Sequence, residues 1–356
     1  LLGRESAEGL LGDHDAQAAD QEALRSLATG DPTLTAEVNW RTAKRLLRMG
    51  NYAEAIEATE AAESVATTAG DERIAAEALL VRGEIYERTG EFVKGLNAVT
   101  AATEIFHRLG NRDGEMRSLV VRGRNCLTRS RYRAARDAYE PVLEQLEREP
   151  DPFLERIIRN HLAVIELCCG DFESAMESSQ RSLTLCEELG DRARVGDNLS
   201  VCGIILMAVG AFEEAKTYLD RGLAILEETK SRWSICDCKL YTGVCAAMLG
   251  DVEGGLELLE ASIAEARELG ARYVLANALT EHAGVLLRRG EKGDDRAAEA
   301  ATREAHEVAR DAALVGIEVL ALSRHAEATV RLGNTMSAVA LSTRAVDLLA
   351  EQDGIE

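Results

Sequence analysis

The chain of 356 residues is poor in proline and in aromatic residues: it has 4 prolines, and Phe, Trp and Tyr together make up 4% of it. It is rich instead in Ala, Leu and Glu, which have high helix propensity. Strand-length segments in which apolar and polar residues strictly alternate are hard to find. The composition therefore predicts an all-α protein.

Long hydrophobic runs are also lacking. No stretch of about 18 apolar residues could span a bilayer. With 46% hydrophobic and 29% charged residues, the chain resembles neither membrane proteins nor disordered ones. No leader with a charged, an apolar and a small-residue region follows Leu1. We therefore expect a soluble, cytoplasmic protein that contacts no membrane.

The chain also lacks an excess of basic residues. The 41 basic residues are outnumbered by 62 acidic residues, which gives a formal net charge of -21. Such a surface repels a phosphate backbone unless basic residues gather on one face. We expect no contact with nucleic acid.

Motifs of catalysis and metal binding are missing as well. The sequence holds no phosphate loop, no His-Glu-x-x-His and no Gly-x-Ser-x-Gly. "GDHDAQAAD" begins like a calcium loop at Asp13 and Asp15 but lacks the Gly and Glu that such a loop needs. The eight cysteines are irregularly spaced, and Cys236-Asp-Cys238 does not match zinc-ligand spacing. We predict no enzyme, no cofactor, no metal site and reduced thiols.

What the chain does have is a repeat of 40 residues. Each intervening stretch of roughly 17 residues carries apolar side chains at three- and four-residue spacing, as in Ile74, Ala78, Val81 and Ile85. Glycine suits the position just after a helix, where a positive φ is often required. Each unit is therefore predicted to be a helical hairpin. One turn of the unit falls at Gly50, Gly90, Ser130, Gly170, Gly210, Gly250 and Gly290, and the other at Gly70, Gly110, Gly190 and Gly270.

Small residues recur within the predicted helices. Ala or Gly at the same place in every unit lets two helix backbones approach closely. An aromatic residue often follows the first turn, as at Tyr52 and Phe92. The column in the first helix is Ala43, Gly83, Gly123, Ala163, Gly203, Gly243, Ala283 and Ala326, and the column in the second is Ala55, Gly95, Ala135, Ala175, Ala215, Gly255, Ala298 and Ala338.

A small residue, a seven-residue interval, Gly-Asp-Tyr/Phe and then Ala together resemble the tetratricopeptide repeat, in the lengthened form found in bacterial signalling and transcriptional regulators. The resemblance implies a right-handed α-solenoid of about eight hairpins plus a partial N-terminal repeat. We expect an N-terminal segment with a partial repeat helix (1–32), an eight-repeat array (33–350) and a C-terminal tail (351–356). The units are expected near 33–70, 71–110, 111–150, 151–190, 191–230, 231–270, 271–312 and 313–350.

The resemblance also implies that the first helices line the inner wall of a superhelix, where partners of such arrays bind. The inner wall of the first three units is rich in Arg, and that of the next three is more apolar. An apolar floor with a basic end suits a peptide or amphipathic helix that carries acidic residues. The alternative stays open that the apolar residues pack between repeats and the arginines pair with nearby glutamates. The candidate groove residues are Trp40, Arg41, Lys44, Arg48, Arg88, Arg117, Arg124, Asn160, Val164, Ile204, Met207, Tyr241 and Val244.

The predicted function is a non-catalytic protein-interaction scaffold or sensor segment of a larger bacterial signalling regulator. It would bind a peptide or helix in the concave groove, from another protein or from another domain of the same parent chain. The alternative is a peptide or small-ligand receptor that switches by changing its superhelical conformation. The sequence leaves the oligomeric state open, since an exposed repeat end can stack on a second copy.

Overall fold

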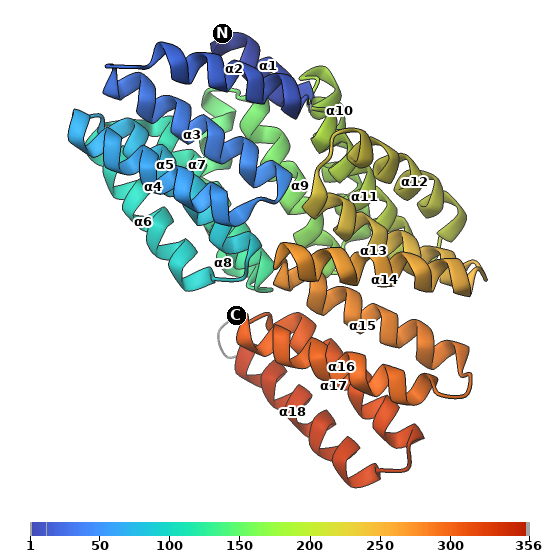
Figure 1. Cartoon of the computed structure of the whole chain (residues 1–356). Helices are drawn as coiled ribbons and strands as arrows, with labels where there is room; N and C mark the ends of the chain where they lie inside the picture. Colours follow the sequence, from blue (N-terminus) through green and yellow to red (C-terminus); the bar gives the residue numbers. More distant parts are fainter. Residues whose placement is uncertain (1, 12, 354–356) are drawn as a thin grey trace.

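The computed structural model describes residues 2–11 and 13–353, which form eighteen helices and no strand (Figure 1). The predicted all-α fold is confirmed. Residue 1, residue 12 and residues 354–356 of the expected terminal segments lie outside the described residues. The helices are α1 (Leu2–Leu11), α2 (His14–Leu27), α3 (Pro32–Met49), α4 (Tyr52–Ala69), α5 (Glu72–Arg88), α6 (Phe92–Arg108), α7 (Arg112–Thr128), α8 (Tyr132–Arg148), α9 (Pro152–Cys168), α10 (Phe172–Glu188), α11 (Arg192–Ala208), α12 (Phe212–Glu228), α13 (Arg232–Met248), α14 (Val252–Leu269), α15 (Arg272–Arg289), α16 (Asp294–Asp311), α17 (Val315–Arg331) and α18 (Thr335–Asp353).

The turns between helices have the backbone that their glycines predict. Gly50 follows α3 with a φ of 79°, and its N–H donates to the carbonyl oxygen of Leu47, near the end of that helix. Where the repeat lacks glycine, Ser130 and Lys230 take the same left-handed conformation, with φ of 60° and 53°. Such a conformation is rare for residues other than Gly. The turn therefore keeps its left-handed conformation at this repeat position even where the residue is not glycine.

The two columns of small residues bring the helices of each hairpin into close contact. A Cβ on Gly243 would lie 2.7 Å from the carbonyl oxygen of Gly255, and a Cβ on Gly255 would lie 2.6 Å from the carbonyl oxygen of Gly243. At Gly123 the space is filled by the ring of Tyr139. At these glycines even a Cβ would clash, and in the other hairpins the helices leave room for no residue larger than Ala, so both columns hold only Ala and Gly.

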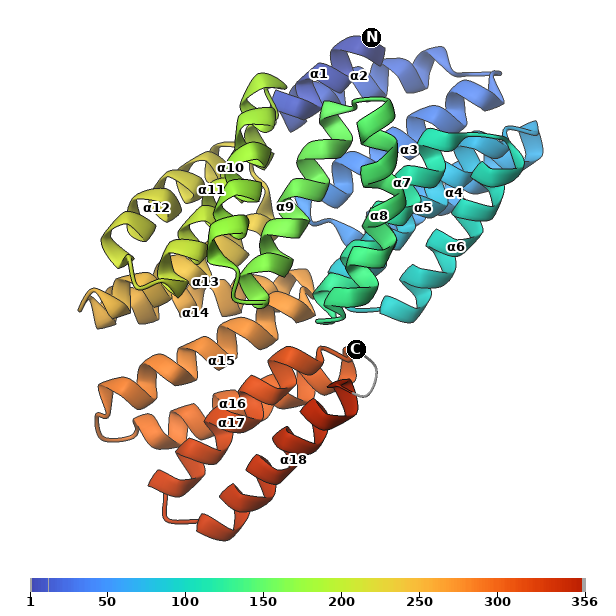
Figure 2. The ribbon, with the colours of Figure 1, turned by 180° about the vertical axis from the view of Figure 1, so that it is seen from behind.

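The hairpins stack into a curved array whose inner side is formed by the odd-numbered helices (Figures 1 and 2). Each odd-numbered helix from α3 to α15 contacts the next odd-numbered helix, whereas the even-numbered helices of neighbouring hairpins hardly touch in the described residues. The odd-numbered helices are therefore closer together, as they must be on the concave side of the curve. Below, the inner face means the partly exposed side chains of α3, α5, α7, α9, α11, α13 and α15.

The array curves so far that its first hairpins pack against hairpins much later in the chain. The lower ends of α3 and α5 lie beside α13 and α14 in both views (Figures 1 and 2). Tyr52 and Ile85 share one hydrophobic cluster with Leu269 and Val274. Phe92 packs in a similar way with residues from α15 to α17, among them Leu314. We call this contact between early and late hairpins the seam.

The N-terminal helices α1 and α2 cover one end of the curve. Glu5 of α1 is buried, and its carboxylate accepts hydrogen bonds from Gln17, Gln21 and Arg41. Asp13, from the segment that begins like a calcium loop, caps α2 by accepting the N–H of Ala16 at 3.0 Å. These contacts dock the N-terminal pair onto α3.

Candidate functional site

All thirteen predicted groove residues lie on odd-numbered helices, and twelve of them are partly or fully exposed. Val244 is the exception, since it is buried in the core shared by α13 to α16. The residues on the first three of these helices are Trp40, Arg41, Lys44 and Arg48 of α3, Arg88 of α5, and Arg117 and Arg124 of α7. The remaining residues are Asn160 and Val164 of α9, Ile204 and Met207 of α11, and Tyr241 and Val244 of α13.

At the early end of the inner face, the arginines pair with carboxylates of the same chain. Arg117 donates to Glu77 at 2.7 Å, and Arg124 donates to Glu87 at 2.7 Å and to Glu84 at 3.2 Å. Burial opposes ionisation of Glu87, but the charges of Arg124 and Arg88 hold the pKa of this carboxyl below its ordinary value. Arg41 likewise donates to Glu5 and Glu37. Most positive charge at this end is therefore neutralised within the array.

Two cations of the early end lie over tryptophan rings. The Nζ of Lys44 is 4.8 Å from the ring centroid of Trp40, and the Cζ of Arg88 is 3.8 Å from that of Trp233 on α13. Solvent reaches Lys44, yet its pKa is lowered because the surrounding helices leave the charge incompletely hydrated. The Arg88 contact joins α5 to α13 and so belongs to the seam.

The later inner face holds amides and phenols together with partly exposed apolar side chains. The Nδ2 of Asn160 donates to the Oδ1 of Asn198 at 3.0 Å, which links α9 to α11. The Nδ2 of Asn277 donates to the hydroxyl of Tyr241 at 3.1 Å, which links α15 to α13. Val164, Ile204 and Met207 lie between these polar groups along the chain and remain partly exposed. This surface offers both hydrogen-bonding groups and apolar area.

Several residues of the odd-numbered helices that the repeat pattern did not single out lie before the predicted positions of their own helices. They include Arg156, whose Nη2 is 3.0 Å from Asp191, and Arg194, which donates to Asp197 at 2.7 Å. Trp233 stacks on Tyr273 of α15, with ring centroids 6.3 Å apart and an interplanar angle of 22°. The 40-residue register could have drawn attention to Trp233 and Tyr273, which are 40 residues apart, but it gives no such signal for Arg156 or Arg194. The same register places 197, 237 and 277 in one column with 37 and 77.

Asp237 has the least compensated charge in this column. Its Oδ1 atom is buried and accepts no hydrogen bond within the part of the chain that the structure describes. Burial raises the pKa of Asp237 to about 7, because water solvates the carboxylate poorly there. The charge of Arg88 opposes this rise, and the charge of Asp197 adds to it.

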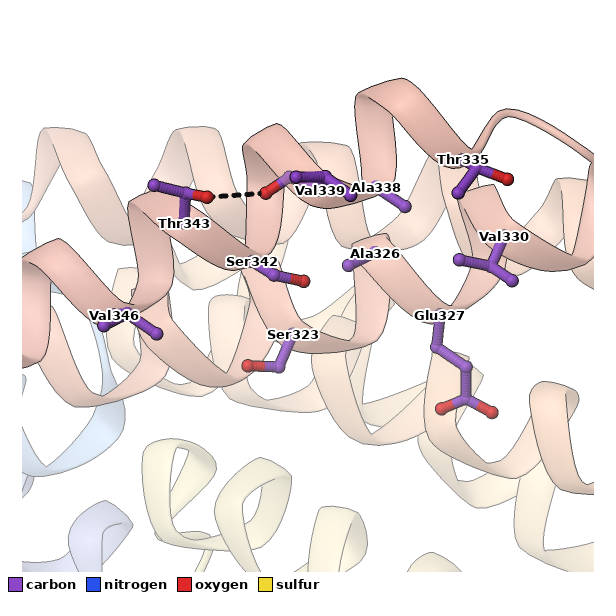
Figure 3. A pocket seen from close by; sticks show the side chains of 10 residues that line it. All are labelled: Ser323, Ala326, Glu327, Val330, Thr335, Ala338, Val339, Ser342, Thr343 and Val346. Atoms are coloured by element: carbon purple, nitrogen blue, oxygen red, sulfur yellow. Dashed lines mark hydrogen bonds between the residues drawn. The ribbon is translucent and has the colours of Figure 1, made fainter.

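A second surface lies between α17 and α18, away from the inner face. It is a groove of about 530 Å³, and Figure 3 shows its lining side chains, among them the Thr343 hydroxyl bonded to the Val339 backbone. Val339 and Val346 are 59% and 63% exposed, whereas Leu256 and Ile263, at the same places on α14, are buried by the next hairpin. The groove is thus the face that a following helix covers elsewhere in the array. Its lining residues are Ser323, Ala326, Glu327, Val330, Thr335, Ala338, Val339, Ser342, Thr343 and Val346.

Other potential sites are limited in the described residues. No cluster of three or more His, Cys, Asp or Glu side chains there is arranged to hold a metal ion. All eight cysteines are free thiols, and five of them are buried. Of the helices that the structure describes, none combines the length and the apolar character needed to cross a membrane.

No protein-family model matches the chain, and no curated protein matches it in sequence. Solved structures do match its fold. A Rap protein complexed with competence and sporulation factor has a TM-score of 0.57 and 14% identity, and the match covers 91% of this chain and all of that one. A Rap conjugation gene regulator of a plasmid, in complex with the Phr* peptide, has a TM-score of 0.64 and 16% identity over 80% of this chain and 77% of that one.

A third similar structure is a signal-transduction ATPase with numerous domains from Pyrococcus horikoshii, which has a tetratricopeptide repeat sensor. Its TM-score is 0.57 at 13% identity, and the match covers 90% of this chain and 49% of that protein. At these identities the likeness shows the fold. The chain is a tetratricopeptide-type α-solenoid, as the repeat pattern predicted.

Proposed function

We propose that this solenoid is a non-catalytic interaction scaffold or sensor segment of a larger bacterial signalling regulator, which binds a peptide or a helix of a partner on its inner face. The observation that carries the proposal is the contrast within that face. The early arginines are neutralised by neighbouring glutamates, whereas the surface from α9 to α15 combines amides, phenols and partly exposed apolar side chains.

This combination suits an extended peptide for a chemical reason. A peptide backbone presents an N–H donor and a carbonyl acceptor at each residue, and an asparagine amide can serve both. Asn160 of α9 is partly exposed and can offer its amide to a peptide, whereas Asn198 and Asn277 are buried and hold Asn160 and Tyr241 in place. Val164 and Ile204 add apolar area against which peptide side chains could be buried. Of the thirteen predicted residues, those on α9, α11 and α13 are the proposed contacts, with Val244 supporting them from the core, and the residues on α3, α5 and α7 form the early end beside the site.

The structural comparisons support the same class of partner. Both similar Rap structures are complexes, one with competence and sporulation factor and one with the Phr* peptide. The signal-transduction ATPase is about twice as long as its match to this chain and has a repeat sensor, which supports the role of a segment in a larger regulator. No observation on the described residues favours the alternative of a receptor that switches by changing superhelical conformation.

The proposal includes a cytoplasmic location and excludes nucleic acid and membranes as partners. Five buried free thiols fit a reducing compartment, where cysteines stay reduced. The net charge of -21 disfavours polyphosphate partners. The partner is a protein or peptide, separate or in the same parent chain.

A peptide-binding experiment tests the proposed function. The probe is a library of N-acetylated hexapeptides, selected on the purified chain and identified by mass spectrometry. The test variant is Val164→Glu with Ile204→Glu, which places two charges on the inner face. The matched control is Val93→Glu with Val209→Glu, which places the same charges at positions that are 73% and 52% exposed.

We expect the wild-type chain and the control to select the same peptides, with at least tenfold weaker binding to the inner-face variant. Circular dichroism should show equal helix content in all three proteins. Equal binding by the inner-face variant, or selection of no peptide by the wild-type chain, would contradict the proposal.

A further inference from the structure

Asp237 differs from the other acidic residues at its repeat position. The four acidic residues of this column are Glu37, Glu77, Asp197 and Asp237, each a multiple of 40 residues from the others. Three of them accept a hydrogen bond from an arginine at 2.7 Å, whereas Asp237 has no cation within ion-pairing distance among the described residues. The pairs are Arg41 with Glu37, Arg117 with Glu77, and Arg194 with Asp197.

Aromatic rings flank this carboxylate. Trp233 and Tyr241 lie one helical turn before and one turn after Asp237, on the same side of α13. Tyr273 of α15 stacks on Trp233, and burial, with a smaller contribution from the charge of Asp237, raises the pKa of both tyrosines. A carboxylate next to the faces of aromatic rings is a favourable environment for an ammonium or guanidinium group.

Arg88, the cation whose charge acts on Asp237, does not fill this place. The guanidinium of Arg88 lies over the ring of Trp233, and it forms no ion pair with Asp237. Its charge opposes the effect of burial on Asp237 but does not overcome it. A carboxylate held in such a place without a partner is costly, and a cation that arrives with a ligand would remove that cost.

We propose that Asp237, with Tyr241 and Tyr273, forms a subsite of the inner face that accepts the positively charged side chain of a lysine or arginine in the bound peptide. Trp233, whose ring Arg88 already covers, forms the border of this subsite. This inference rests on the proposed function, since the subsite lies in the proposed peptide site. It assigns a basic residue to that peptide, whereas the arginine-rich early end suggested acidic residues. The net charge of -21 would also draw a cationic peptide toward the chain.

The test uses two hexapeptide libraries, one N-acetylated and one with free amino termini, selected on the full chain and on two variants. Asp237→Asn removes the unpaired charge with almost no change of shape. Asp197→Asn is the matched control, because it removes the same charge one repeat earlier, where Arg194 already pairs with it. Thermal unfolding of each variant shows that it is folded.

We expect peptides selected on the wild-type chain from the acetylated library to carry Lys or Arg at one fixed position. Replacing that residue by methionine should weaken binding at least tenfold to the wild-type chain and less than twofold to Asp237→Asn. Asp197→Asn should keep the wild-type preference. Such coupling between the two changes is specific to a contact between them.

Four results would overturn the subsite, and they separate it from the proposed function. Selected peptides without a fixed basic position, or an unchanged preference in Asp237→Asn, would leave peptide binding standing and remove the subsite. A basic preference that appears only with free amino termini would show that the cation is the peptide terminus rather than a side chain. Selection of no peptide at all would refute both proposals.

Discussion

The two ends of the inner face differ in how completely their charged side chains are paired. From α3 to α7, arginines and glutamates on neighbouring helices neutralise one another, as Arg124 does with Glu84 and Glu87. From α9 to α15, amides and a phenol bond to one another, and Arg194 pairs with Asp197. The Oδ1 atom of Asp237 accepts no hydrogen bond among the described residues. At this repeat position Glu37, Glu77 and Asp197 each pair with an arginine, and Asp237 alone among the four acidic residues does not, in the part of the chain that the structure describes. A carboxylate paired within the fold has less to gain from a ligand than an unpaired one.

The largest loss of stability is expected when an ion pair of the early end is removed. Glu87 is only 5% exposed, and Glu87→Gln leaves the largely covered charge of Arg124 with Glu84 as its one remaining carboxylate partner. We expect the free energy of unfolding to fall by about 3 kcal/mol, measured by urea denaturation. The control Glu228→Gln disrupts the exposed pair of Glu228 with Arg192 and should cost less than about 0.5 kcal/mol. Equal losses in the two variants would remove the distinction between inner and outer ion pairs.

The seam should show the next largest effect, because it holds the two ends together. Leu269→Ala removes a buried side chain that packs in the cluster shared by the early and late hairpins. We expect a loss of about 2 to 3 kcal/mol in urea denaturation and a larger radius of gyration by X-ray scattering. Leu27→Ala, at a residue 66% exposed, is the control and should change neither quantity. An unchanged radius in Leu269→Ala would show that the seam does not maintain the curvature.

The unpaired carboxylate predicts a pH dependence with a definite sign. The folded pKa of Asp237 is about 7, above the value of about 3.9 for unfolded aspartate, so the folded state binds a proton between these values. Stability from the neutral acid is present at low pH and is lost as the pH rises through 7. Asparagine is neutral throughout.

The advantage of Asp237→Asn over the wild-type chain should therefore grow by on the order of 2 kcal/mol between pH 5 and pH 8, measured by urea denaturation. Asp197→Asn should instead lower stability, since Arg194 loses its partner. A difference for Asp237→Asn that stays constant or shrinks as the pH rises would mean that this carboxylate is well solvated or paired in solution.

The smallest effect on stability is expected at the amide bridge of the later end. Asn160→Ala removes the hydrogen bond to Asn198 and should cost about 1 kcal/mol. Binding of a selected peptide should weaken more than this loss of stability suggests, because the amide is also a proposed peptide contact. Isothermal titration calorimetry measures this affinity, at a temperature where the variant is fully folded. Unchanged affinity would remove Asn160 from the site.

The hairpins were predictable because their signals are local and periodic. Turn glycines such as Gly50 and the small residues at Gly243 and Gly255 recur every 40 residues, and each meets a steric requirement within its own hairpin. The division of the chain into a 1–32 segment, eight units and a tail remains our proposal. The side of the helices that faces inward was also predictable, since it follows from the same register.

The seam and Asp237 were not predictable in this way. Tyr52 meets Leu269 only because curvature accumulates over many hairpins, and no local pattern encodes that sum. Asp237 has the same residue type and register as Asp197, and only the surrounding helices show that one is paired and the other is not. Val244 is buried for a similar reason, since the packing of α13 to α16 covers an apolar side chain at an inner position.

The central claim is that ligand binds at the later end of the inner face, and photo-cross-linking tests it most directly. A peptide selected on the wild-type chain would carry a diazirine side chain at each position in turn, and mass spectrometry would identify the residues it joins. We predict cross-links to α9, α11, α13 and α15, with the basic end of the peptide nearest Asp237. Cross-links mainly to the groove between α17 and α18, or to the even-numbered helices, would contradict the account.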